Sequence, residues 1–281
     1  MYQFPIGVMT DSFRLPFFEA LKKAKEVGAK GIQVYTTKGE MAPENLTPQK
    51  RREILNAVKD EGLVISALCG DFGKGFGNRR ENPELIERSR RVLELARELE
   101  CNIVTTHIGV VPESKTHERY KVMQEACFEL SRFADDMQAH FAIETGPERA
   151  EVLKEFLDSL HSRGVAVNLD PANFKMVTGD DPVKAVYLLK DYIVHTHAKD
   201  GIKLRECDPE VIYGMIEEEI ERGAAFLETP LGEGSVDFPN YLKALSNVGY
   251  KGFLTIEREV GDDPQKDIEL AVRFLKKQLE A

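Results

Sequence analysis

Residues 141–170 read FAIETGPERAEVLKEFLDSLHSRGVAVNLD, and this stretch decides the fold. Two short apolar runs, at 141–143 and 165–169, flank a longer run with apolar residues at helical spacing. A strand, a helix and a second strand of these lengths form the repeating unit of a parallel sheet. An acidic residue directly follows each strand, Glu144 after the first and Asp170 after the second.

The same alternation extends over the whole chain. We count eight strand–helix units, and no linker rich in proline, glycine or serine interrupts them, so one domain over residues 1–281 is expected. Gly28 closes the first predicted helix, and Thr47 followed by Pro48 starts the second. The remaining apolar runs predicted to be strands lie at 5–10, 31–35, 63–68, 102–106, 192–194 and 252–256.

Eight such units predict an α/β fold, namely a single (β/α)8 TIM barrel. The 281 residues are close to the length of about 250 that is typical of this barrel. An open, doubly wound sheet is the structural alternative, because periodicity alone does not separate the two. No glycine fingerprint for a dinucleotide follows the first strand, which weakens that alternative.

Composition narrows the class of protein. Hydrophobic residues make up 42% and charged residues 31%, a balance typical of a soluble globular enzyme. The net charge of −10 argues against nucleic acid as a partner. No apolar run approaches the ~18 residues of a membrane span, and the first residues lack a signal-peptide pattern. The four cysteines have no C-x-x-C spacing, so we expect neither structural zinc nor disulfides. Free cysteines also lead us to expect a cytoplasmic location.

Polar residues stand where the predicted strands end. Besides Glu144 and Asp170, His107 follows the fourth strand, His197 ends the seventh and Glu257 ends the eighth. Because strand carboxyl ends share one mouth in a barrel, we expect the three carboxylates and His197 to converge. Converging carboxylates repel one another unless a cation lies among them. The set suits one divalent metal ion, Mn²⁺, Mg²⁺ or Co²⁺ in preference to Zn²⁺, with coordination positions left open for catalysis.

Each of these residues also has a simpler interpretation. A glutamate after a strand is commonly a solvated loop residue, and Asp170 precedes a proline and would cap a turn. Recurrence after successive strands favours the site. His107 is interpreted either as a substrate contact or as a core histidine. We expect His195 to point to the face opposite His197 and to be structural. The other histidines, His117, His140 and His161, are interpreted as surface or packing residues.

Five motifs in a fixed order carry a family resemblance. They are Ile143-Glu144-Thr145-Gly146, Asn168-Leu169-Asp170-Pro171-Ala172-Asn173, His195-Thr196-His197-Ala198-Lys199-Asp200, Gly232-Glu233-Gly234-Ser235-Val236-Asp237-Phe238, and Gly249-Tyr250-Lys251-Gly252 with Ile256-Glu257-Arg258-Glu259. On these motifs the chain resembles the xylose isomerase-like barrel superfamily over nearly its whole length. The resemblance is to the sugar-phosphate isomerase/epimerase branch, which includes D-tagatose 3-epimerase, hydroxypyruvate isomerase and inosose dehydratase.

The resemblance implies Glu144, Asp170, His197 and Glu257 as ligands of one divalent metal ion. It also implies that Glu144 and Glu257 carry protons, and that the partner is a small sugar or sugar phosphate. Members often form dimers or tetramers, so a homo-oligomer is a further expectation. Asn173 departs from several members, which have a histidine three residues after the aspartate. No Asp-x-His triplet occurs in the strand-seven loop, so the zinc nucleases of the superfamily are not matched.

The reaction implied is isomerisation or epimerisation of a ketose or related hydroxy-carbonyl sugar. It proceeds by proton abstraction and a metal-stabilised enediolate. Loss of a β-hydroxyl from the same intermediate would instead make the chain a dehydratase of an inosose-like keto-polyol, and the ligand set does not choose between them. A non-catalytic sugar-binding or scaffold barrel is the alternative of another class, which the retained carboxylates disfavour.

Four residues are candidate substrate contacts: His107, Asn173, Glu148 and Lys199. Glu148 and Lys199 have the alternative of a solvated residue or a salt-bridge partner.

The glycine-rich loop at 70–77 is interpreted either as a lid, whose two phenylalanines exclude water, or as a flexible surface loop. Lys74, Arg79 and Arg80 would either reach a substrate phosphate or face water.

Overall fold

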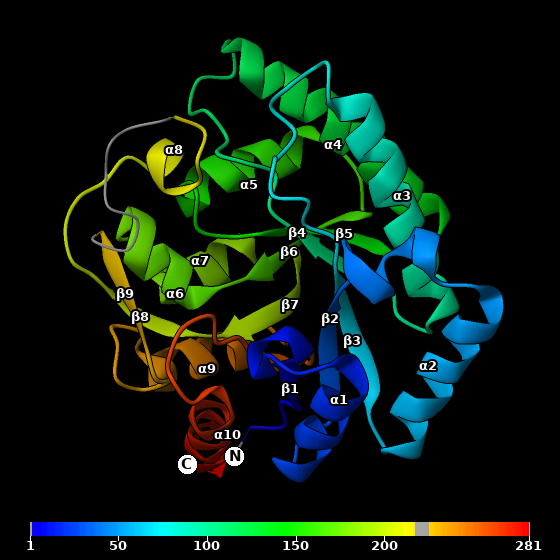
Figure 1. The fold of residues 1–281 in the computed structure, drawn as a ribbon. Helices are drawn as coiled ribbons and strands as arrows, with labels where there is room; N and C mark the ends of the chain where they lie inside the picture. The colour runs from blue at the N-terminus through cyan, green and yellow to red at the C-terminus, as the bar shows by residue number, and fades with distance from the viewer. Residues whose placement is uncertain (1, 217–224, 281) are drawn as a thin grey trace.

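The computed structural model of the chain describes residues 2–216 and 225–280, and its centre is a closed barrel of eight parallel strands (Figure 1). The predicted (β/α)8 fold is therefore confirmed, and the open sheet is excluded. In the order that closes the barrel, the strands are β1 (Ile6–Met9), β10 (Leu254–Ile256), β7 (Ile193–Ala198), β6 (Val165–Leu169), β5 (His140–Glu144), β4 (Ile103–Thr106), β3 (Val64–Cys69) and β2 (Gly31–Tyr35).

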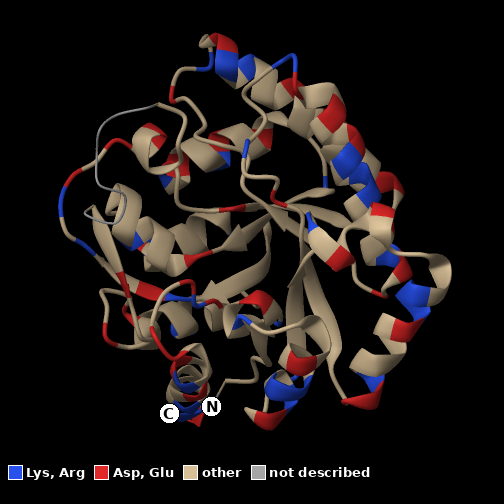
Figure 2. Ribbon diagram, viewed as in Figure 1, with Lys and Arg blue, Asp and Glu red and all other residues tan. Residues whose placement is uncertain are grey.

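Helices surround the barrel, and lysines, arginines and acidic residues alternate along their outer sides (Figure 2). α5 illustrates why they form, because its buried residues Ala150, Leu153, Phe156 and Leu157 recur at helical spacing. No helix in the described ranges has the length and apolar character needed to cross a membrane. The longer helices are α1 (Phe17–Glu26), α2 (Pro48–Asp60), α3 (Asn82–Glu98), α4 (Glu118–Asp136), α5 (Ala150–Ser159), α7 (Pro182–Leu189), α9 (Phe238–Asn247) and α10 (Pro264–Glu280).

Short helical segments occupy several loops. They are the 3-10 turns η1 (Thr10–Phe13), η2 (Gly39–Met41) and η3 (Pro43–Asn45), the π-helical turn η4 (Phe174–Thr178), and the helices α6 (Pro171–Asn173) and α8 (Pro209–Ile212).

Two features after β6 differ from the sequence prediction. β7 continues past the apolar run at 192–194 to Ala198, so His197 lies inside the strand, one residue before its end. An antiparallel pair, β8 (Asp200–Lys203) and β9 (Phe226–Thr229), lies outside the barrel and was not predicted. The buried Asp200 carboxylate accepts hydrogen bonds from the backbone of Gly232, Gly234 and Val236, which fastens the next loop to this pair.

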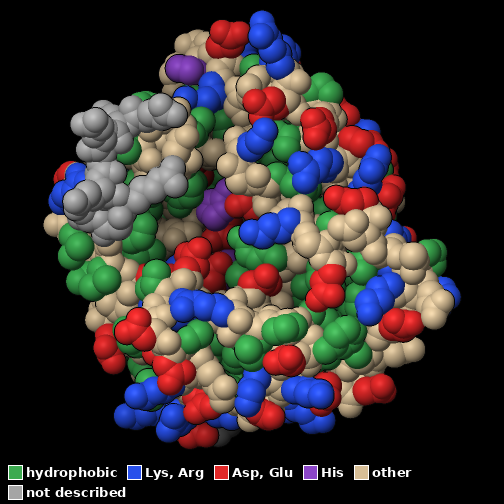
Figure 3. Space-filling view, viewed as in Figure 1, with side chains coloured by type: hydrophobic (Ala, Val, Ile, Leu, Met, Phe, Trp, Pro, Cys, Tyr) green, Lys and Arg blue, Asp and Glu red, His purple; other side chains and the backbone are tan. Residues whose placement is uncertain are grey.

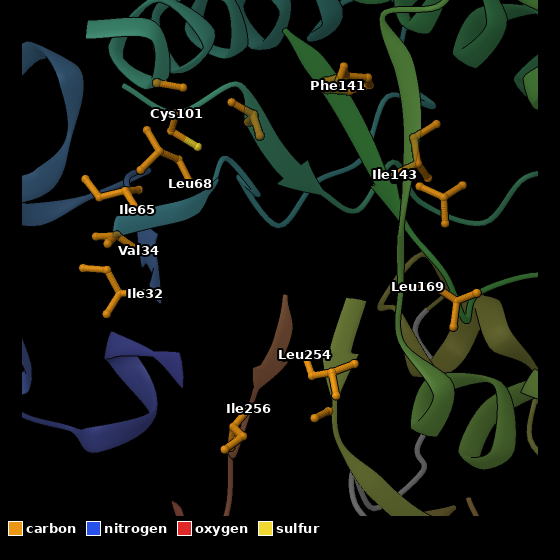
Figure 4. Close-up of a cluster of buried hydrophobic side chains, with 14 of the residues drawn as sticks. Ile32, Val34, Ile65, Leu68, Cys101, Phe141, Ile143, Leu169, Leu254 and Ile256 are labelled. Atoms are coloured by element: carbon orange, nitrogen blue, oxygen red, sulfur yellow. The ribbon is translucent and has the colours of Figure 1, made fainter. Parts of the chain in front are cut away.

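Alternation along each strand separates two environments. Residues such as Ile32, Phe141 and Leu254 belong to one buried hydrophobic cluster between strands and helices, part of which is drawn in Figure 4. Their strand neighbours, among them Gln33 and Thr255, point to the barrel interior. The barrel therefore has an apolar outer layer and a polar interior near the mouth.

At the opposite end of the interior, the ring of Phe253 lies against two glycines. A Cβ atom at Gly31 would lie 2.5 Å from Cε1 of Phe253, and one at Gly7 would lie 3.3 Å from its Cδ1. Both contacts are too close for an additional methyl group without displacement of the ring. Glycine at these positions is therefore required by packing.

We expect Gly31→Ala to lower the free energy of unfolding by about 1–3 kcal/mol, because the new methyl group overpacks the ring of Phe253. Urea unfolding would measure this. Phe253→Leu opens space at the same point, so the double variant should lose less stability than the two single losses added together. Simple additivity of the two losses would contradict the packing argument.

Candidate metal centre

The four residues expected to converge lie together at the carboxyl ends of their strands. Glu144 is the last residue of β5 and His197 lies near the end of β7, while Asp170 and Glu257 directly follow β6 and β10. One ligand atom from each residue lies within 4.8 Å of those of the other three. All four residues are buried.

The carboxylates surround a single nitrogen of His197. Its Nδ1 lies 3.3 Å from Asp170 Oδ2, 3.3 Å from Glu257 Oε2 and 3.5 Å from Glu144 Oε1. Three buried carboxylates at this separation repel one another, and a positive charge among them relieves the repulsion. A donor set of three carboxylates and one imidazole nitrogen fits a divalent metal ion.

Gln33 fixes the orientation of His197. The side-chain Nε2 of Gln33 donates to Thr105 Oγ1 at 3.0 Å, so its Oε1 faces His197 Nε2, also at 3.0 Å. The proton on His197 Nε2 then points to Gln33, and Nδ1 is the nitrogen that faces the carboxylates and would bind a metal ion among them. Sequence reasoning missed Gln33, whose only signal is its polarity within an apolar strand.

His195 lies on the same side of β7 as His197, so the expectation that it faces the other way was wrong. Residues two apart on a strand share a face, and the two ring centroids are 5.8 Å apart. His195 Nδ1 donates to Asn168 Oδ1 at 2.9 Å, and Asn168 Nδ2 donates to Glu144 Oε2 at 3.1 Å. Burial lowers the pKa of His195 well below its usual value. As a neutral ring, His195 positions Asn168, which holds Glu144.

Lys199 is a buried salt-bridge partner of Glu257. Its Nζ donates to Glu257 Oε2 at 2.9 Å and also to Glu259, and it lies 3.7 Å from Glu228 Oε2. Burial lowers the pKa of Lys199, but Glu257 and Glu259 outweigh it, so the pKa lies well above the usual value. Burial likewise raises the pKa of Glu257, and Lys199 and His197 reverse this to well below the usual value. Glu257 is therefore ionised.

His107 stands at the mouth. Its Nδ1 lies 3.2 Å from Asp71 Oδ2, and its Nε2 lies 3.7 Å from Glu144 Oε1. Burial lowers the pKa of His107, but Glu144 and Asp71 outweigh burial and raise it to about 9. The ring therefore carries a positive charge, and it lies between the carboxylates of Asp71 and Glu144.

The other two candidate contacts separate in space. Asn173 Nδ2 donates to Glu144 Oε1 and to the carbonyl oxygen of Thr145, each at 3.2 Å, and Asn173 lines the cavity at the mouth. Glu148 is not among the described residues that line this cavity. Its Oε2 accepts from the backbone N–H of Val111 at 3.1 Å, and burial raises its pKa to about 8. In this geometry Glu148 braces the loop after β4.

A cavity of about 200 Å³ opens over the carboxylate cluster, and Figure 3 shows the hollow with histidine and acidic side chains inside it. Ile212, the last residue of α8, and Tyr213, which follows it, line this cavity. Arg119 of α4 holds α8 through an ion pair with Glu210. Tyr213 lies 5.4 Å from His107, between ring centroids. Nothing in the sequence pattern singled out α8, because it lies in a long excursion between barrel strands.

The loop at 70–77 does not supply these walls. Phe76 is buried against Phe141 with 6.0 Å between ring centroids, and Phe72 packs under Arg88 at 4.0 Å. Neither phenylalanine is among the described residues that line the cavity, so the lid interpretation was wrong.

The basic residues beside that loop are paired elsewhere. Lys74 pairs with Glu81 at 3.3 Å, and Arg79 pairs with Glu125 of α4 at 2.5 Å. Both pairs are exposed, and none of their four residues is among the described residues that line the cavity.

The sequence profile of the xylose isomerase-like TIM barrel family matches residues 21–278. The chain belongs to this family. The resemblance noted from the five motifs is thereby confirmed.

Known members show how broad the family is. The putative L-ribulose-5-phosphate 3-epimerase SgbU of Haemophilus influenzae is 21% identical over 93% of this chain and 91% of its own length. Inosose dehydratase of Clostridium botulinum is 24% identical over 56% of this chain and 52% of its own length. The crystal structure of a xylose isomerase domain protein from Planctomyces limnophilus superposes with a TM-score of 0.80 at 24% identity, covering 99% of this chain and 97% of that one.

We expect Gln33→Leu to weaken metal binding about 10–100-fold, because His197 loses the partner that fixes its Nδ1 toward the carboxylates. Competition with a fluorescent chelator would measure the affinity. Gln49→Leu, the same change on the exposed side of α2, serves as the control. Unchanged affinity in folded Gln33→Leu would show that Gln33 does not orient the ligand.

Proposed function

We propose that this chain is a divalent-metal-dependent isomerase or epimerase of a ketose or related hydroxy-carbonyl sugar. The observation that carries the proposal is the buried cluster of Glu144, Asp170, His197 and Glu257 beneath a small cavity. A scaffold has no need of three buried carboxylates, whose desolvation is costly. The epimerase and dehydratase names among its relatives support the same kind of chemistry.

Glu144, Asp170, Glu257 and Nδ1 of His197 would hold the ion. When bound, it would act as a Lewis acid that polarises the substrate carbonyl and offsets the negative charge developing on its oxygen. Manganese, magnesium or cobalt suits this oxygen-rich donor set better than zinc.

Glu144 and Glu257 would carry the proton from and to the substrate. Lys199 keeps Glu257 ionised and holds its Oε2, so Oε1 is the oxygen that accepts a proton from the carbon beside the carbonyl. β5 and β10 are separated by β6 and β7 around the barrel, so Glu144 and Glu257 approach the substrate from different sides. Return of a proton by the second glutamate gives epimerisation, and return to the neighbouring carbon gives isomerisation.

Dehydration is the second candidate function. It starts with the same proton abstraction and ends with loss of a β-hydroxyl, and the partial match to inosose dehydratase supports it. His107 is positively charged and lies at the cavity wall, which suits protonation of a departing hydroxyl at its Nε2. An absorbing unsaturated product would identify this reaction.

We expect wild-type protein to contain close to one divalent ion per chain, and Glu144→Gln to lose most of it because one carboxylate ligand becomes a neutral amide. With a panel of ketoses in D2O, exchange of the C–H proton beside the carbonyl should fall at least about 100-fold in Glu144→Gln and in Glu257→Gln. Elemental analysis and proton NMR would measure the two quantities.

Glu151→Gln, on the exposed face of α5, is the matched control and should keep both metal and exchange. Wild-type exchange in either site variant would remove that glutamate from the mechanism. No metal after reconstitution with each ion would overturn the proposal as a whole.

A further inference from the structure

We infer that the cavity takes a neutral, unphosphorylated sugar or polyol and discriminates against its phosphate ester. This inference rests on the proposed function and narrows its substrate class. It follows from the charges, the apolar wall and the size of the cavity above the carboxylate cluster.

The cavity wall is acidic. Glu144, Glu257 and Glu259 all line it, and Asp170 lies buried among the proposed ligands. A divalent ion bound by three carboxylates still leaves one net negative charge at the centre. A phosphate dianion placed in so small a space would be repelled by the centre and by Glu259.

The cations of the wall are already engaged. Lys199 contacts Glu257, Glu259 and Glu228, and His107 lies between Asp71 and Glu144. Each positive charge is thus offset by at least as many carboxylates. To bind phosphate, Lys199 would have to give up a buried ion pair, which is costly. His107 Nε2 makes no hydrogen bond, but it lies 3.7 Å from Glu144 Oε1, so a phosphate at that nitrogen would also be repelled by Glu144.

Other common phosphate-binding groups are absent from the part of the wall that the structure describes. No arginine is among the described residues that line the cavity. The backbone N–H groups at the start of α6, at Ala172 and Asn173, already donate to Asp170 Oδ1 at 2.8 and 2.9 Å. Among the described residues, a phosphate would therefore find neither an arginine for bidentate binding nor free N–H groups at the start of α6.

Part of the wall is apolar, formed by Met9, Met176, Val177, Ile212 and Phe226. The uncharged polar groups beside it, on Tyr35, Cys69, Asn173 and Tyr213, suit the hydroxyls of a sugar and add no positive charge. The apolar side chains suit the C–H face of a sugar or polyol, whereas a phosphate against them would lose its hydration without compensation. At about 200 Å³, the cavity is also below the ~300–1,000 Å³ of typical ligand pockets.

The test compares two matched pairs of substrates on the metal-loaded enzyme: D-fructose with D-fructose 6-phosphate, and D-ribulose with D-ribulose 5-phosphate. We expect kcat/KM for deuterium exchange to be at least about tenfold higher for each free ketose than for its ester, because of the repulsion described above. Faster exchange of the esters would overturn the inference and leave the proposed function standing.

Absence of exchange with all four compounds would count against the proposed reaction instead. Calorimetric titration of the metal-loaded protein with the same pairs then decides the inference separately. Tighter binding of the free ketoses supports it, while tighter binding of the esters, or no binding of any compound, overturns it.

A charge placed in the wall provides a second test. Ile212→Arg adds a cation at the cavity, and it should raise the ratio of ester to free-ketose kcat/KM at least about fivefold. Leu227→Arg adds the same charge on β9, where the side chain is half exposed and outside the described cavity lining. That control should leave the ratio unchanged, and an equal rise in both variants would mean that the wall does not set the selectivity.

Discussion

Repulsion among three buried carboxylates is the constraint on which the rest of this structure depends. Glu144, Asp170 and Glu257 surround Nδ1 of His197 at 3.3–3.5 Å in an interior from which water is largely excluded. Such a cluster is stable only with positive charge at its centre and with every other polar atom held by a partner. Gln33, Asn168 and Lys199 supply partners to His197, Glu144 and Glu257, and a divalent metal ion would supply the positive charge.

The polar interior is built in layers along the barrel axis. Phe253 packs against Gly7 and Gly31 at one end, and next come the hydrogen-bonded side chains that orient His197 and Glu144. The carboxylates and the cavity follow at the other end. Because these layers sit on strands whose outer faces form one hydrophobic cluster, the site is held by the same elements that stabilise the fold.

Sequence reasoning succeeded where one pattern carried the information. Strand–helix alternation predicted the barrel, and the barrel placed Glu144, Asp170, His197 and Glu257 at one mouth. It failed for side chains that act through distant partners. Gln33 and Asn168 read as isolated polar residues in strands, and only the closed sheet brings them to the cluster.

Other misses have a local physical cause. The β8–β9 pair and α8 lie in a long excursion with weak periodicity, so Tyr213 and Ile212 could not be placed at the cavity. Lys199 was ambiguous because its ion pairs join residues 58 and 60 positions apart in the chain. The loop at 70–77 suggested a lid through its composition, yet Phe76 packs into the core.

The most direct test of the account is anomalous X-ray diffraction from crystals of the Mn²⁺-loaded protein, recorded on both sides of the manganese absorption edge. We predict one strong peak within about 2–2.5 Å of Nδ1 of His197 and of carboxylate oxygens of Glu144, Asp170 and Glu257. A peak elsewhere, coordination through Nε2 of His197, or no bound manganese would contradict it.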